Sequence, residues 1–154
     1  MLRFRAPRRA VLAAILSSVL LSACGGGDYW DEFVPRDPTI DDIESQSFVF
    51  TDFSYGAVFD PALDHTRTTL AFGPASADGS AHRLPFSLLA DGAAAAGRAR
   101  LQGPRLTLDI ESAGSGLPFT VGQRLDFDLQ ADIDDGRIRL TNRSSGVQQT
   151  SAPR

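Results

Sequence analysis

The chain has 154 residues, with 15 arginines and no lysine against 19 acidic residues, two histidines and a single cysteine. A net charge of -4 leaves it without the basic footprint of a nucleic-acid-binding protein. One cysteine cannot form an intramolecular disulfide, so stability has to come from packing, and the length suits one domain.

The N-terminal segment has the order of residue types that is typical of an export signal. Residues 1–9 carry four arginines and no acid, residues 10–21 are almost wholly apolar, and small residues follow. The apolar run has about twelve residues, well short of the roughly 20 that a transmembrane helix needs. The segment is therefore predicted to be a secretory signal peptide rather than a permanent membrane span.

The end of this segment resembles the lipobox of bacterial lipoproteins, through Leu21, Ser22, Ala23 and Cys24. In that class the signal peptide is cleaved before the cysteine, and the cysteine is acylated on its sulfur and on its new amino group. The resemblance implies that residues 1–23 are removed and that Cys24 is the site of lipid attachment. The alternative is an ordinary signal peptide cleaved near Ala23, which would leave an odd free thiol in an oxidising compartment.

The residue after the cysteine bears on which membrane holds the protein. An aspartate there tends to retain lipoproteins of this class in the inner membrane, and this chain has Gly25. The resemblance therefore implies an anchor in the outer membrane, with the domain facing the periplasm. Removal of residues 1–23 leaves 131 of the 154 residues and 11 of the 15 arginines against 19 acids, a net charge of -8. Acyl chains, rather than electrostatic attraction, would hold such a chain on a membrane.

The next stretch is acidic and rich in residues that resist folding. Residues 25–46 contain seven acids against one arginine, together with three glycines and two prolines. Such a composition buries too little apolar surface to offset the entropy of ordering. We therefore expect residues 24–46 to be the lipidated N-terminus and a flexible tether.

Within this tether an aromatic group stands out, formed by Tyr29, Trp30 and Phe33. One interpretation is contact with a partner or with the membrane interface, where Trp and Tyr are favoured. The other is that these rings fold back onto the domain and simply add buried area. The sequence leaves both interpretations open.

From residue 47 onward apolar and polar residues alternate, with Gly, Pro and Asp between the runs, which predicts a β domain over residues 47–143. Strands are expected at 48–51 and 66–72, and an antiparallel meander from 82 to 143, interrupted by a loop at 112–123. The early strands are expected to cover the meander's apolar face. The predicted fold is all-β, a small antiparallel β-sandwich or flattened barrel, followed by a flexible polar tail at 144–154.

Two turns fix the register of the first part of the meander. With Asp91 and Gly92 as a turn, paired residue numbers add up to 183, which places Leu84 opposite Ala99. With a second turn at Gly103 and Pro104, the numbers of paired residues in the next hairpin add up to 207. Both hairpins then place the same residues of the shared strand on the apolar side, with the pairs Ala99–Leu108, Leu101–Leu106 and Arg98–Asp109.

A third turn, at Asp135 and Gly136, gives a total of 271 for the last hairpin. This register matches an apolar face with three acid–arginine pairs, and a slip of one residue would destroy both. The apolar pairs are Ile133–Ile138 and Ala131–Leu140, and the charged pairs are Asp134–Arg137, Asp132–Arg139 and Asp128–Arg143.

The sequence contains few residues in patterns that indicate catalysis or metal binding. His65 follows Asp64 and could act as a base oriented by a carboxylate, but no serine-nucleophile motif accompanies it, and His82 starts a strand. The acids around Gly136 do not have the spacing of a calcium loop, and the register gives them arginine partners. We therefore predict no catalytic site, no metal site and no cofactor.

These observations favour a non-catalytic lipoprotein whose β domain binds or supports another envelope component, most simply a protein. A sheet edge, the loop at 112–123 or the aromatic residues of the tether would make the contact. One alternative is a periplasmic inhibitor or a module that binds a small apolar ligand inside the domain. Another is a hydrolase that uses His65. A filled interior favours the first function, and a real cavity favours ligand binding.

Overall fold

Short runs of alternating apolar and polar residues, separated by Gly, Pro and Asp, become the strands of this chain. The computed structural model describes residues 32–51 and 57–153, and the folded domain is the compact unit Phe33–Arg154. The elements of the described part are, in chain order, β1 (Pro35–Arg36), the 3-10 turn η1 (Ile40–Asp42), β2 (Ser47–Phe50), the 3-10 turn η2 (Pro61–Leu63), β3 (Thr68–Phe72), β4 (Ser76–Asp78), β5 (Ala81–Ala90), β6 (Ala93–Gln102), β7 (Arg105–Ala113), β8 (Arg124–Asp132), β9 (Ile138–Asn142) and β10 (Gln148–Thr150).

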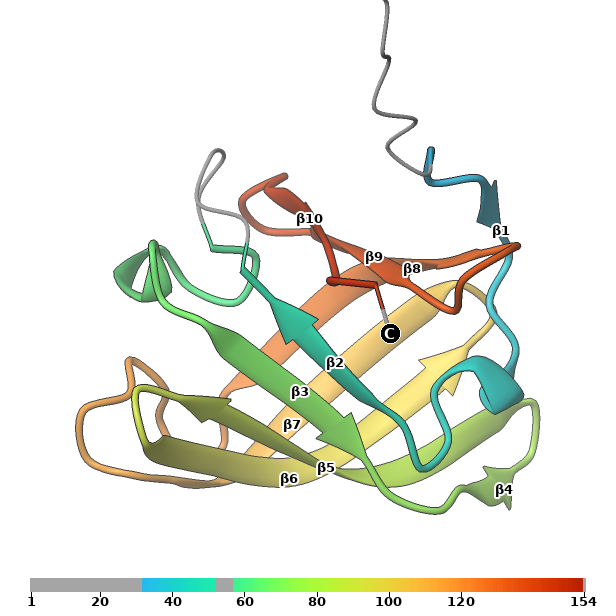
Figure 1. The fold of residues 1–154 in the computed structure, drawn as a ribbon. Helices are drawn as coiled ribbons and strands as arrows, with labels where there is room; N and C mark the ends of the chain where they lie inside the picture. Colours follow the sequence, from blue (N-terminus) through green and yellow to red (C-terminus); the bar gives the residue numbers. More distant parts are fainter. Residues whose placement is uncertain (1–31, 52–56, 154) are drawn as a thin grey trace, which may run out of the picture. The chain divides into compact units, whose positions relative to one another are not determined.

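One antiparallel sheet connects the strands in the order β10-β9-β8-β7-β6-β5-β3-β2, with β1 paired to β8 and β4 paired to β5. In Figure 1 this sheet curls until β2 and β3 lie in front of β7 and β8, which gives a nearly closed barrel. The predicted all-β fold of the sandwich or flattened-barrel kind is confirmed. The strands between residues 47 and 72 extend the curled sheet and so cover its apolar face.

The predicted register of β5, β6 and β7 is confirmed. Asp91 and Gly92 both have positive φ, 48° and 78°, as a tight two-residue hairpin turn requires. Leu84 faces Ala99, and Ala99 faces Leu108 in turn. The register shifts only beyond Gly97, where a Cβ atom would lie 1.9 Å from a backbone oxygen of β7, so this bulge requires glycine.

The predicted register of the last hairpin is wrong by two residues. Ala131 faces Ile138 rather than Leu140, and residues 133–137 form a longer loop than the expected two-residue turn. Because the shift is an even number of residues, the apolar face of each strand still points inward. Ile133, however, lies in the loop and is 57 % exposed instead of buried.

The C-terminal residues complete the barrel, so the expected flexible tail at 144–154 is wrong for this stretch. β10 pairs with β9, and Ser151 is 3 % exposed. The amide of Ser151 donates to the carbonyl of Ile138 at 2.8 Å, and the amide of Ala152 donates to the carbonyl of Val49 at 2.7 Å. Figure 1 accordingly shows the segment after β10 beside β2.

The described part of the expected tether is also folded. β1 pairs with β8, and Ile43 is fully buried in the core. The amide of Ser45 donates to the carbonyl of Gly73 at 3.2 Å, and Glu44 accepts from the amide of Ala75 at 2.7 Å. The domain therefore begins near residue 33 rather than at 47, and residues 24–31 of the expected tether lie outside the described residues.

Aromatic side chains fill the barrel interior. Phe59, from the segment between β2 and η2, is 2 % exposed. Its ring meets Phe50 of β2 edge-on with 5.3 Å between centroids, and Phe127 of β8 with 5.7 Å. One side chain thus joins two walls of the barrel and occupies the space between them.

The segment that carries Phe59 is fixed by two side chains from the C-terminal strands. Gln149 accepts from the amide of Val58 at 3.1 Å, and Asn142 donates through Nδ2 to the carbonyl of Val58 at 2.8 Å. Val58 is fully buried, so these bonds satisfy backbone groups that water does not reach.

Candidate functional site

The structure describes only one of the residues predicted to attach lipid or to contact a partner. Cys24, Tyr29 and Trp30 lie outside the described residues. Phe33 is described and half-buried, and its ring packs under two arginines of the loop and strand beside it. The Cζ atom of Arg139 lies 3.9 Å from the ring centroid, and that of Arg137 lies 5.9 Å from it. For Phe33, folding back onto the domain is therefore the interpretation that the structure supports.

Arg139 is held in a partly dehydrated position by this packing. Its Nε donates to Thr150 Oγ1 at 3.1 Å. Burial lowers the pKa of Arg139, the charge of Arg137 lowers it further, and Asp132 acts in the opposite direction. The guanidinium stays charged at neutral pH, so the ring of Phe33 covers a cation on the outer face of β9.

Arg36 holds the first residues of the domain in place through an ion pair. Arg36 makes a bidentate ion pair with Asp42, one bond of which measures 2.8 Å. The amide of Thr39 also donates to Asp42, at 2.6 Å. Burial opposes ionisation of Asp42, but the bonds from Arg36 and Thr39 outweigh it and lower the pKa of this carboxyl.

The loop between β8 and β9 is built around one buried ion pair. The side chain of Asp132 is 1 % exposed and that of Arg137 is 13 % exposed, with 3.1 Å between Arg137 Nη2 and Asp132 Oδ2. Asp135 makes a second ion pair with Arg137, and Asp132 also accepts from the amide of Asp134 at 3.0 Å. These contacts replace the predicted pairs Asp134–Arg137 and Asp132–Arg139.

The structure places one histidine in a turn and the other in a strand. His65 lies in the turn after η2 with φ of 64°, and its side chain is 71 % exposed. Its Nε2 lies 3.5 Å from Asp64 Oδ2, the carboxylate that the sequence places next to it. His82 is a half-buried residue of β5 that faces Leu101 of β6.

No group of three or more His, Cys, Asp or Glu side chains in the described residues is placed to hold a metal ion. Of the acids near Gly136, Asp132 and Asp135 instead form ion pairs with Arg137. Among the same residues, no helix has the length and apolar character that a membrane span requires.

The loop between β7 and β8, another predicted contact surface, is shorter than expected because β7 continues to Ala113. The loop folds back onto the barrel: Phe119 is 5 % exposed, and Ile110 exchanges backbone hydrogen bonds with Gln123 and Gly122. Val121, in the turn between Thr120 and Gln123 that precedes β8, is 69 % exposed. One apolar side chain is a small surface for a partner.

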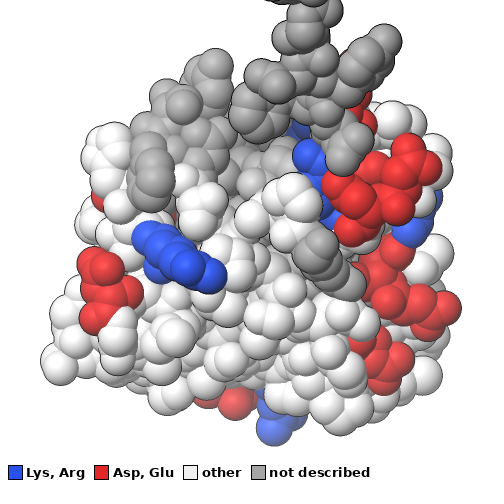
Figure 2. Space-filling model, viewed as in Figure 1, with Lys and Arg blue, Asp and Glu red and all other residues white. Residues whose placement is uncertain are grey.

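Acidic side chains gather on one side of the face in Figure 2, the side where β1, η1 and the β8–β9 loop lie in Figure 1. This charge disfavours contact of that side with anionic lipid headgroups. The acids of these segments with exposed or half-exposed side chains are Asp37, Asp41, Asp42, Glu44, Asp134 and Asp135.

The outer face of β5–β8 carries a different pattern, in which arginines outnumber the acids available to them. Arg83 of β5 lies directly opposite Arg100 of β6, and Arg100 lies opposite Thr107 of β7. Four ion pairs, with distances between 2.7 and 3.1 Å, use most carboxylates of this face: Asp78–Arg83, Glu111–Arg98, Asp109–Arg124 and Asp128–Arg143. The last is a predicted pair, formed despite the shifted register.

Two arginines of this face are left over. In the part of the chain that the structure describes, neither Arg100 nor Arg105 makes an ion pair. They border a hollow of about 250 Å³ whose lining residues are Arg100, Gln102, Arg105, Thr107, Arg124 and Asp126. The sequence contained a signal for this site, because the confirmed total of 183 already places Arg83 opposite Arg100.

Comparisons with protein-family models, with curated proteins and with solved structures find no match to this chain. A barrel of this kind does not indicate a function by itself, because β-barrels carry many unrelated activities. The function therefore has to be inferred from the residues and the geometry of the chain itself.

Proposed function

We propose that the chain is a lipoprotein of the bacterial outer membrane, anchored through acyl chains on Cys24, whose β domain binds or supports another envelope component. The anchor rests on the leader at residues 1–23 and on its resemblance to a lipobox. In this proposal the domain faces the periplasm and catalyses no reaction.

The filled interior is the observation that carries the binding role. Phe59 sits between Phe50 and Phe127, and all three side chains are at most 2 % exposed. An apolar ligand would need the volume that these rings take up. Recognition by this domain therefore falls to its outer surface, which suits a macromolecular partner better than a small apolar molecule.

The surroundings of His65 give a hydrolase no support. Its side chain is 71 % exposed, so it lies in bulk water rather than in a dry pocket that would strengthen the electrostatic stabilisation of a transition state. Its carboxylate neighbour Asp64 is 39 % exposed and screened in the same way.

The anchor is tested by comparing the wild-type protein with Cys24→Ser in cells of a bacterium that processes lipoproteins. We expect wild type in the outer-membrane fraction and Cys24→Ser outside it, with its leader retained. Equal distribution of the two proteins would refute the anchor.

The binding role is tested by crosslinking in intact cells, with the wild type and with a variant that lacks residues 26–31 and so keeps Gly25 after Cys24. This deletion spares every described residue, so the folded domain is kept. We expect the same discrete crosslinked partner with both proteins, because the proposal places the contact on the β domain. A partner captured only by the wild type would move the contact to the deleted segment, and absence of a discrete partner would refute the binding role.

A further inference from the structure

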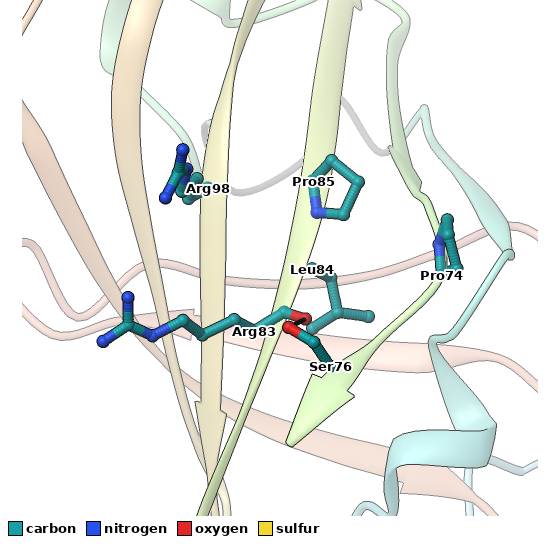
Figure 3. A pocket seen from close by; sticks show the side chains of 6 residues that line it. All are labelled: Pro74, Ser76, Arg83, Leu84, Pro85 and Arg98. Atoms are coloured by element: carbon teal, nitrogen blue, oxygen red, sulfur yellow. Dashed lines mark hydrogen bonds between the residues drawn. The ribbon is translucent and has the colours of Figure 1, made fainter. Parts of the chain in front are cut away.

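The outer face of β5–β8 combines a charged hollow with an apolar one. The charged hollow is the one bordered by Arg100 and Arg105. Along the face, a second hollow of about 190 Å³ is lined by Pro74, Ser76, Arg83, Leu84, Pro85 and Arg98. We call it the apolar hollow after its two prolines, although it also contains two arginines and a serine. Figure 3 shows Pro74 and Pro85 on either side of this second hollow, with Arg98 on the adjoining strand.

The register makes these hollows neighbours. Arg98 borders the apolar hollow and Arg100 borders the charged one, and the two residues share the outer face of β6 because they are two positions apart. Arg83, which lines the apolar hollow, lies directly opposite Arg100. A chain segment lying across β5, β6 and β7 would touch both hollows.

The charged hollow suits a carboxylate. Arg100 and Arg105 are diagonal neighbours on paired strands, because Arg100 faces Thr107 and Arg105 is two residues before it. Diagonal positions are about 7–8 Å apart, within the reach of two long side chains toward one group. Guanidinium forks bind carboxylates and phosphates in a bidentate manner. Asp126 also lines the hollow and accepts from Thr107 Oγ1 at 2.8 Å, so two guanidiniums without an ion pair face one such carboxylate and the hollow keeps an excess of positive charge.

The net charge of the chain determines whether an anion is attracted to the charged hollow from a distance. A chain of net charge -4, or -8 once residues 1–23 are removed, does not attract polyanions from a distance, so binding depends on contacts within the hollows. The apolar hollow between Pro74 and Pro85 adds contact area that a free inorganic anion would not use. A peptide that carries acidic and apolar side chains together fits both features.

We propose that this face binds an extended acidic segment of a partner protein, with carboxylates at Arg100 and Arg105 and an apolar side chain between Pro74 and Pro85. The inference rests on the proposed binding role and gives the chemistry of the partner. It leaves the ion pairs of Arg83, Arg98 and Arg124 in place.

The test uses the full-length protein in detergent and a short fluorescent peptide of glutamate, leucine and glycine, with fluorescence anisotropy as the readout. We expect saturable binding of this peptide and none of a matched peptide with lysine in place of glutamate. The double variant Arg100→Gln, Arg105→Gln should bind the acidic peptide at least about tenfold more weakly, a loss of about 1.4 kcal/mol. Arg67→Gln, which removes a charge from an exposed arginine outside this face, should bind as the wild type does.

Three results would overturn the inference: no binding by the wild type, equal weakening by Arg67→Gln, or full displacement of the peptide by inorganic phosphate at equal concentration. The last would identify a small-anion site. Thermal unfolding of each variant verifies that it is folded. Because these peptides do not depend on the anchor or on the native partner, a failure here leaves the crosslinking result to decide the proposed function separately.

Discussion

The backbone amide of Ala152 donates to the carbonyl oxygen of Val49 at 2.7 Å. This bond joins the segment after β10 to β2, the two ends of the sheet order, so the curled sheet becomes a nearly closed barrel. A paired edge is also protected from pairing with other chains. Stability therefore depends on the last residues of the chain.

Truncation after Thr150 removes three hydrogen bonds that involve Ser151 and Ala152, namely two with the backbone of Ile138 and one with Val49. At about 1 kcal/mol for each bond, we expect the free energy of unfolding to fall by about 3 kcal/mol. Urea unfolding measures it. A chain that ends at Ala152 keeps all three bonds and should match the full-length protein. If the two truncated chains are equally stable, the closure of the barrel contributes nothing.

Asp132→Ala breaks the buried pair with Arg137 and leaves a guanidinium that is 13 % exposed without one of its two carboxylates. We expect a loss of about 3 kcal/mol of stability. Asp109→Ala is the matched control, because its pair with Arg124 has side chains that are 45 % and 64 % exposed and should contribute under about 1 kcal/mol. Similar losses for both variants in urea unfolding would contradict the role given to Asp132.

The stability of the domain should depend on pH through Asp42. Its pKa in the folded protein lies below the ordinary value of 3.8, so its contribution is fully present above that pH and is lost as the pH falls through the folded pKa. Asp42→Asn should therefore be less stable than wild type at neutral pH, and the difference should shrink below about pH 4. Unfolding free energies measured across this range give the answer. If the difference in stability between wild type and Asp42→Asn does not change with pH, ionisation of Asp42 is not the cause of the pH dependence.

Arg100 lies directly opposite Arg83, and like charges at such positions oppose each other. Arg100→Glu should therefore raise the free energy of unfolding by about 0.2–1 kcal/mol, while abolishing binding of the acidic peptide. Arg98→Glu is the control, since it breaks a pair with Glu111 that measures 3.1 Å and should lower stability slightly. A gain in stability together with a loss of binding is a combination that a purely structural Arg100 would not produce.

The central strands were predictable because their signals are local. Asp91 and Gly92 fix a two-residue turn, and that turn sets every pair from Ala90–Ala93 to His82–Leu101. The alternation of apolar residues independently requires the same register, so two signals agree. The alanine run at 93–96, which has helical propensity, forms strand because this register dominates.

The last hairpin was mispredicted because its register depends on a distant segment. β1 pairs with the end of β8, with Pro35 opposite Asp132, and the amide of Ile133 donates to the carbonyl of Val34 at 3.2 Å. These contacts and the buried Asp132–Arg137 pair hold residues 133–137 as a loop. Local sequence favours a turn at Asp135 and Gly136 and contains no sign of β1.

The two ends of the domain were mispredicted for a related reason. Their composition is polar or acidic, yet single residues fix them: Ile43 is buried in the core, and Ser151 bonds with the backbone of Ile138. Composition averages over a segment and does not detect one well-placed side chain. The Arg36–Asp42 pair, which neutralises part of the acidic run, likewise depends on the folded positions of both residues.

Mass spectrometry of the protein purified from bacterial envelopes measures the modification of residue 24. We expect a chain that begins at Cys24 and carries the added mass of acyl groups on its sulfur and its amino terminus. A chain that retains residues 1–23, or that has an unmodified thiol at Cys24, would contradict the membrane anchor and with it the proposed place of this domain in the envelope.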